Sequence, residues 1–201
     1  MKKVMICEGL NDGMLIEAIM DKSNFAKSEI RMFHQKSVPM NEKKHAETTI
    51  LRSFMQDNLY NPYKFLVKLE GGKDSAMKIF CRELVNLTRI DDCILMLDLD
   101  TETPEKRIQL LKKTIYHSYS QTTPLELKFE RQREHSHLYH FSCSVFITNN
   151  EIGKFQVVFF RVSLENSCSI KKKDSEEIKL KKIKQFMEKE KIQDFFNPIV
   201  N

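Results

Sequence analysis

The chain has 201 residues, of which 41% are hydrophobic and 30% are charged, and its formal net charge is +5. This length and balance are typical of a folded domain with a sizeable core, and they exclude an intrinsically disordered chain. No apolar run reaches the ~20 residues that a membrane-spanning helix needs, so we expect no membrane association. The five cysteines are odd in number and never in Cys-x-x-Cys spacing, which indicates reduced thiols and a cytoplasmic location.

The first 120 residues alternate between apolar runs typical of strands and segments with helical spacing. The expected strands are 3–7, 30–33, 65–69 and 93–97, and the expected helices are about 11–22, 42–59, 74–87 and 104–119. Asn11 and Asp12 can cap the first helix, and Pro104 suits the first turn of the last one. This order predicts an α/β fold with a central, mostly parallel sheet flanked by helices.

The pattern changes after Pro124. Three longer apolar segments follow, at 125–129, 138–147 and 155–164, and the turn over 148–153 fits a hairpin. One of these strands is expected to complete the main sheet, while the others add an antiparallel region. A helix over 174–195 closes the chain, with Leu180, Ile183 and Met187 on its buried face. We therefore expect one domain over 1–201, with a core of about 1–120 plus the strand near 155–164, an antiparallel elaboration at about 124–154 and a basic C-terminal helix at about 174–195.

Two short acidic motifs stand where expected strands end. Glu8, Gly9 and Asp12 follow the run 4–7, and Asp98, Asp100 and Glu102 follow the run 94–97. The carboxyl ends of parallel strands meet at one sheet edge, where ligands bind in open α/β folds. Mg²⁺ prefers oxygen ligands such as carboxylates. Together the two motifs predict a divalent-metal site.

Each of these acids also has a simpler interpretation. Glu8 and Asp12 can be a loop acid and a helix N-cap, and Asp98 and Asp100 can be turn residues at a strand exit. Glu102 can be an acid in the first turn of the following helix, where the helix dipole favours it.

Two further features lie at the ends of other strands. Gly71-Gly72 indicates a tight turn, with a close approach to nucleic acid as the alternative. Glu165-Asn166 follows the strand near 155–164 and can add a ligand, but we expect a surface loop there.

The order strand-Glu8-Gly9-x-x-Asp12-helix, then strand-Asp98-x-Asp100-x-Glu102, resembles the TOPRIM domain family. This domain is shared by topoisomerases, bacterial-type primases, small ribosomal-RNA maturases and OLD-type nucleases. The intervening strand that ends at Gly71-Gly72, with Asp74 opening a helix, is closer to the small OLD-type and archaeal TOPRIM-like nucleases. The resemblance covers about 1–120 and the strand near 155–164.

The resemblance implies a TOPRIM-like fold and Mg²⁺- or Mn²⁺-dependent hydrolysis of phosphodiesters in DNA or RNA. It implies that Asp98 and Asp100 hold the metal and that Glu8 is a general acid/base or a further ligand, which makes these three the expected catalytic residues. Asp12 and Glu102 match further acidic positions of the family. OLD-type nucleases usually carry an ATPase domain, so the expected partners are nucleic acid and a separate ATPase or other protein chain. The alternative function is a non-catalytic module that binds nucleic acid or a partner.

The positive charge is concentrated near the end of the chain. Residues 171–191 hold nine lysines and five acids, which is +4 of the net +5. Lysines release counterions when they neutralise phosphates, so this stretch predicts nucleic-acid contacts. The candidate residues are Lys171, Lys172, Lys173, Lys181 and Lys182. The alternative is a solvated helix face with Glu–Lys pairs.

The remaining motifs predict little chemistry. His135, His137 and His140 lack the accompanying ligands of a zinc site. No Gly-rich phosphate loop or dinucleotide motif is present in the sequence.

Overall fold

A seven-stranded sheet runs through the computed structural model, which describes residues 2–23, 25–34, 50–51, 53–55, 62–119 and 124–200. The strand order is β2-β3-β1-β4-β7-β6-β5. Neighbouring strands from β2 to β7 pair in parallel, while β6 is antiparallel to both β7 and β5. The strands are β1 Lys3–Cys7, β2 Ile30–His34, β3 Phe65–Leu69, β4 Asp92–Asp98, β5 Leu125–Glu134, β6 Leu138–Ile147 and β7 Asn150–Phe160. The predicted α/β class and mostly parallel sheet are confirmed.

The inner strands form because their apolar runs can be covered on both faces. Every residue of β1 and β3 is buried, and so is every residue of β4 except Asp92. Continuous apolar runs of this kind are typical of parallel strands between two helical layers. Alternate side chains enter separate cores: Val4 and Ile6 on one face, Met5 and Cys7 on the other.

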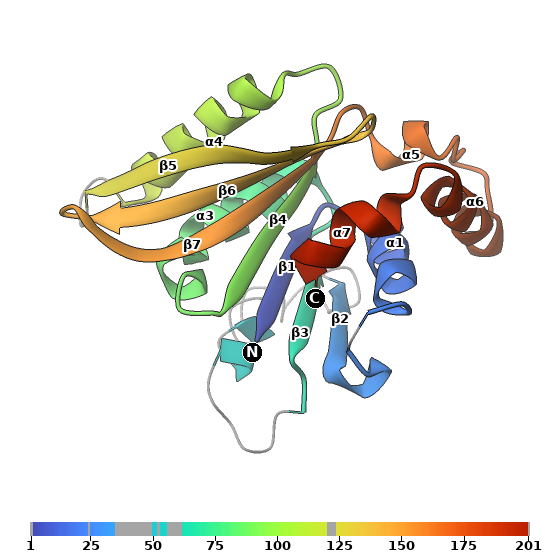
Figure 1. The fold of residues 1–201 in the computed structure, drawn as a ribbon, viewed down its shortest axis with the longest axis horizontal. Coiled ribbons are helices and arrows are strands. Elements are labelled where there is room, and N and C mark those ends of the chain that lie inside the picture. The colour runs from blue at the N-terminus through green and yellow to red at the C-terminus, as the bar shows by residue number, and fades with distance from the viewer. Residues whose placement is uncertain are drawn as a thin grey trace, which may run out of the picture.

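Helices cover both faces of the sheet. The helices are α1 Leu10–Met20, α3 Lys73–Leu87, α4 Pro104–Tyr119, α5 Leu164–Ser167, α6 Glu176–Lys189 and α7 Ile192–Val200, with a 3₁₀ turn at Lys27–Glu29. α3 and α4 contribute to the core on one face, and α1, α6 and α7 contribute to the core on the other. Figure 1 shows α7 in front of the central strands and α3 behind the sheet.

In the sheet, β2 and β3 lie on one side of β1, whereas β4 and the strands that follow it lie on the other side. The neighbours β1 and β4 are parallel, but the helix after β1 lies on one face and the helix after β4 on the other. Adjacent strands whose connections leave to opposite faces open a crevice at their carboxyl ends. The fold therefore places the residues after Cys7 and Asp98 at a topological switch point.

The antiparallel region grows outward from β7. As expected, β7 completes the parallel part of the sheet, and β6 and β5 add to it as successive hairpin partners. Thr148 and Asn149 connect β6 to β7 with φ values of 49° and 66°. Two consecutive positive φ values are typical of the two-residue hairpin turns whose twist matches the strands.

The end of the chain differs from the single helix expected over 174–195. It forms two helices, α6 and α7, because Lys191 adopts a left-handed φ of 51° between them. Ile183 and Met187 lie in the core as expected, whereas Leu180 is only half-buried. Most of the helix predicted over 42–59 lies outside the described residues, although 50–51 and 53–55 are helical. Of the helices that the structure describes, none has both the length and the apolar character needed to cross a membrane.

Candidate metal centre

Glu8 and Asp98 meet at the switch point. Because β1 and β4 are adjacent and parallel, the residues that follow them lie side by side. The Glu8 Oε1 atom accepts a hydrogen bond of 2.6 Å from the backbone N–H of Asp98. The side chain of Asp98 lies within the protein, since the residue is only 9% exposed. The two acidic motifs, ninety residues apart in sequence, therefore form one site.

Asp12 joins this pair from the first turn of α1. Its Oδ2 atom accepts a hydrogen bond of 2.8 Å from the N–H of Gly9, the N-cap residue. This contact makes Asp12 a capping acid, although at the third helical position rather than at the cap itself. The residue is 7% exposed, which is unusual for a carboxylate that serves only to cap a helix. Capping and membership of the acidic cluster are thus compatible roles.

Glu165 completes the cluster, although we expected it in a surface loop. The segment after β4 runs beside the segment after β7: the N–H of Leu99 donates to Phe160 O at 2.9 Å and the N–H of Asp100 to Val162 O at 2.8 Å. This pairing carries α5 to the same sheet edge. There Glu165 Oε1 accepts a hydrogen bond of 2.6 Å from the amide of Asn11 on α1. Its place after an expected strand made Glu165 a possible ligand in the sequence, but that pattern alone did not indicate which strand β7 would pair with.

Asp100 and Glu102 lie at the rim of the site with cationic partners. Asp100 adopts a left-handed φ of 56°, and its carboxylate pairs with Lys73 at the start of α3. Glu102 pairs with the buried guanidinium of Arg107 on α4. Glu102 precedes α4, which begins at Pro104, so it is not a residue of the first turn.

The carboxylates of the cluster repel one another when they are ionised. Burial, together with repulsion from Asp12 and Glu8, raises the pKa of Asp98 to about 9. Burial and the nearby charges of Glu8 and Glu165 raise the pKa of Asp12 to about 7. Burial also raises the pKa of Glu8, against the opposing effects of the Asp98 N–H and the Lys73 ammonium. Like-charged groups that share a buried site resist joint ionisation unless a cation balances them.

The donor chemistry of these residues fits a hard divalent cation. The Oδ1 atom of Asp98 is buried, no described residue gives it a hydrogen bond, and further carboxylates surround it. An orphaned buried carboxyl oxygen of this kind calls for a partner such as a ligand or an ion. As placed, no three His, Cys, Asp or Glu side chains of the described segments form a group that could hold a metal ion. Glu8 would therefore have to turn away from the Asp98 N–H, and Asp100 from Lys73, to serve as ligands.

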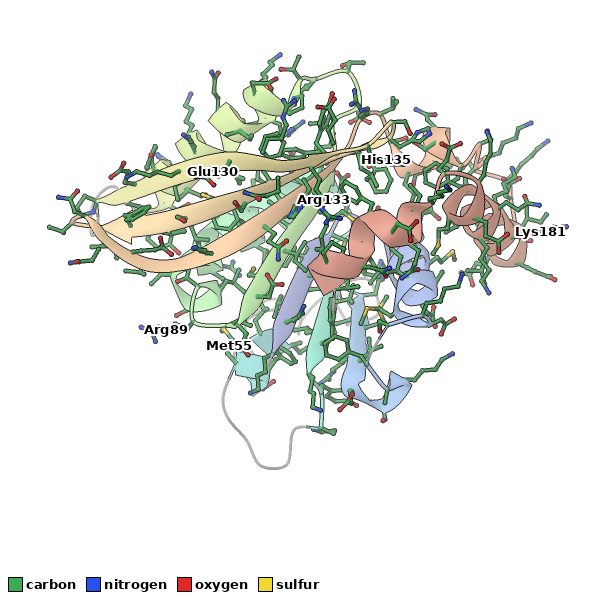
Figure 2. All side chains as sticks on the ribbon, viewed as in Figure 1. Met55, Arg89, Glu130, Arg133, His135 and Lys181 are labelled. Carbon is green, nitrogen blue, oxygen red and sulfur yellow. The ribbon has the colours of Figure 1, made fainter. Side chains whose placement is uncertain are left out.

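The candidate nucleic-acid lysines differ in their surroundings. Lys171, Lys172 and Lys173 are exposed, and they start one residue after Ile170, whose N–H donates to Glu165 O at 2.8 Å. Lys181 is exposed on the outer side of α6 (Figure 2). Lys182 instead has structural partners, because its Nζ lies 2.7 Å from both Ser169 O and Asp174 Oδ2.

The three histidines do not gather at one point. His137 lies 3.3 Å from a Glu190 carboxylate oxygen, and the His135 ring contacts the Glu190 carbonyl at 2.9 Å. His140 contacts Gln156 at 2.7 Å. The two Glu190 contacts join the β5–β6 turn to the end of α6, whereas the His140 contact joins β6 to β7.

The fold and this cluster define an α/β protein with buried acids at the switch point of a mostly parallel sheet. In comparisons with models of protein families, with curated proteins and with solved structures, none matches this chain.

Proposed function

We propose that this chain is a TOPRIM-type nuclease that hydrolyses phosphodiester bonds in DNA or RNA and depends on Mg²⁺ or Mn²⁺. The observation that carries the proposal is the meeting of Glu8, Asp12, Asp98 and Glu165 from three segments at one sheet edge. Such a cluster destabilises the folded chain unless it binds a cation, and so it supports a site selected for function rather than for folding. The order of the acidic motifs resembles that of the TOPRIM family.

Asp98, Asp12 and Glu165 would hold the cation once their carboxylates converge on it, with Glu8 and Asp100 as further ligands after they turn. A bound divalent cation would neutralise phosphate charge and polarise the phosphorus–oxygen bond. Hydrolysis transfers water across that bond, so one proton leaves the water and one reaches the departing oxygen. Glu8 is the candidate for this proton exchange, because burial raises its pKa toward the range useful for general acid–base work.

The surroundings of the site support a polyanionic substrate. Lys171, Lys172 and Lys173 begin four residues after the last residue of α5, and Lys181 extends the positive charge along α6. We propose that these lysines contact the phosphate backbone and that Lys182 chiefly holds the 169–174 turn in place. A separate ATPase or other protein chain as partner remains part of the proposal through the family resemblance alone.

The cellular compartment is proposed from the thiols. All five cysteines are free and buried, which suits a reducing compartment such as the cytoplasm.

The test is cleavage of labelled single- and double-stranded DNA and RNA with Mg²⁺, with Mn²⁺ and with EDTA. We expect cleavage that requires the cation and falls by at least about a hundredfold in Asp98→Asn and Glu8→Gln. Glu130→Gln is the matched control, since Glu130 is an exposed acid on β5 (Figure 2). Equal cleavage by all variants would reject the assignment of the site, and no cleavage of any polymer by the wild type would reject the nuclease.

The second candidate is a non-catalytic module that binds nucleic acid or a partner chain. It is favoured by the ion pairs of Asp100 with Lys73 and of Glu102 with Arg107, which neutralise two of the five predicted ligands. This function predicts salt-sensitive binding of nucleic acid that is lost on neutralising 171–173, with the polymer left intact.

A further inference from the structure

Lys73 occupies a position that the stability of its helix does not explain. It is the first residue of α3, where the helix dipole disfavours a cation. Its side chain is only 17% exposed, and its ammonium pairs with Asp100. The same ammonium lowers the pKa of Glu8, so its field reaches into the acidic cluster. The one lysine in this turn of α3 therefore interacts with the acids rather than with its own helix.

We propose that Lys73 is a phosphate-binding residue that exchanges partners when the site is loaded. This inference rests on the proposed function. Without a divalent cation, Lys73 takes the place of that cation at Asp100. When the carboxylates bind the cation, Asp100 turns toward it, and the ammonium is left to bind a phosphate oxygen of the nucleic-acid strand.

The local geometry leaves room for that phosphate. Gly71 and Gly72 precede Lys73, and a Cβ added at Gly72 would meet no atom of the described residues within 4 Å. Among the described residues no side chain caps the start of α3, which leaves its first N–H groups free for a ligand. On the cation side stands the buried Oδ1 atom of Asp98, to which no described residue gives a hydrogen bond, and the field of Asp100, the partner of Lys73, reaches Asp98. A strand bound at the cation thus has an ammonium within reach of its phosphates.

If Lys73 exchanges partners, its removal should change the affinities for Mn²⁺ and for an oligonucleotide in opposite directions. Removal of a purely structural lysine would not produce that pattern. Lys73→Met removes the competitor for Asp100, so the affinity for Mn²⁺ alone should rise by up to about fivefold, as expected for loss of a partly exposed ion pair. The same variant should bind a fluorescein-labelled single-stranded oligonucleotide, in Ca²⁺ to prevent turnover, about ten- to a hundredfold more weakly. Lys73→Arg, which keeps a phosphate-binding cation, should retain most of the oligonucleotide affinity.

Calorimetry with Mn²⁺ and fluorescence anisotropy with the oligonucleotide measure the two effects. Lys78→Met is the matched control, because Lys78 is an exposed lysine of the same helix. An unchanged or weaker Mn²⁺ affinity in Lys73→Met would overturn the competition, and an unchanged oligonucleotide affinity would overturn the phosphate contact. Failure of the wild type itself to bind Mn²⁺ would reject the metal centre and this inference with it, whereas cleavage by Lys73→Met at the wild-type rate would reject this inference alone.

Discussion

Asp98→Asn should stabilise the metal-free protein, and increasingly so as the pH rises. The folded state holds a proton on Asp98 up to about pH 9, whereas the ordinary pKa of aspartate is 3.8. Unfolding therefore releases a proton between these two values, so the free energy of unfolding falls with rising pH across that window. Below pH 3.8 Asp98 is protonated in both the folded and the unfolded state, so it no longer makes the free energy of unfolding depend on pH.

The size of this effect on the free energy of unfolding follows from the raised pKa of Asp98. Each pH unit in this window lowers the free energy of unfolding by at most about 1.4 kcal/mol, which gives a ceiling of about 4 kcal/mol at pH 7. Asp12 and Glu8 can take up protons in place of Asp98, so we expect the gap between variant and wild type to widen by about 2–4 kcal/mol from pH 5 to pH 8. For a chain of this length that corresponds to roughly 5–15 °C in the midpoint of thermal unfolding.

The assay is urea and thermal unfolding followed by circular dichroism in EDTA at pH 5, 6, 7 and 8. Glu130→Gln serves again as the control and should show no such widening. A constant gap between Asp98→Asn and wild type at all four pH values would refute the reasoning, and so would a variant that is less stable throughout. Adding Mn²⁺ at a hundred times its dissociation constant should restore about 2.7 kcal/mol to the wild type and much less to the variant.

Three other substitutions test separate parts of the structure. Glu165→Gln should weaken Mn²⁺ binding measured by calorimetry by at least about tenfold, while Glu176→Gln, an exposed acid in the first turn of α6, should leave it unchanged. Replacing Lys171–Lys173 with glutamine should reduce the slope of log affinity against log salt by up to about 0.7–0.9 per lysine in anisotropy titrations, and an unchanged slope would place the nucleic acid elsewhere. Gly153→Ala should lower the free energy of unfolding by about 1–3 kcal/mol, because its Cβ would lie 2.6 Å from the backbone oxygen of Thr88; an equal urea midpoint would contradict that packing.

The sequence sufficed for features that depend on local pattern. The apolar runs that became β1, β3 and β4 need no partner to be recognised, since their composition is typical of buried parallel strands. Glu8 and Asp98 could be placed at one edge by the general rule that parallel strands end together. That rule needs no knowledge of strand order.

Features that depend on pairing between distant segments could not be predicted from the local sequence pattern. Glu165 enters the cluster only because β7 pairs with β4, which draws α5 against α1, and nothing near Glu165 in the sequence encodes that pairing. The contact of Lys73 with Asp100 likewise joins the start of α3 to the segment after β4. The break at Lys191 was missed because a left-handed residue that is not glycine leaves no signal in the sequence.

The unfavourable electrostatics of the cluster bear on the choice between a nuclease and a binding module. A module that held nucleic acid through lysines alone would gain stability by replacing Asp98, whose charged form is opposed by burial and by its neighbours. Retaining that carboxylate has a physical reason only if something positive comes to the site. Cation binding is therefore expected under both functions, and cleavage separates them. A wild type that binds Mn²⁺, and loses that binding in Asp98→Asn, but leaves every polymer intact would favour a module in which the cation bridges protein and phosphate. Cation-dependent cleavage would instead assign Glu8 and Asp98 to the reaction itself.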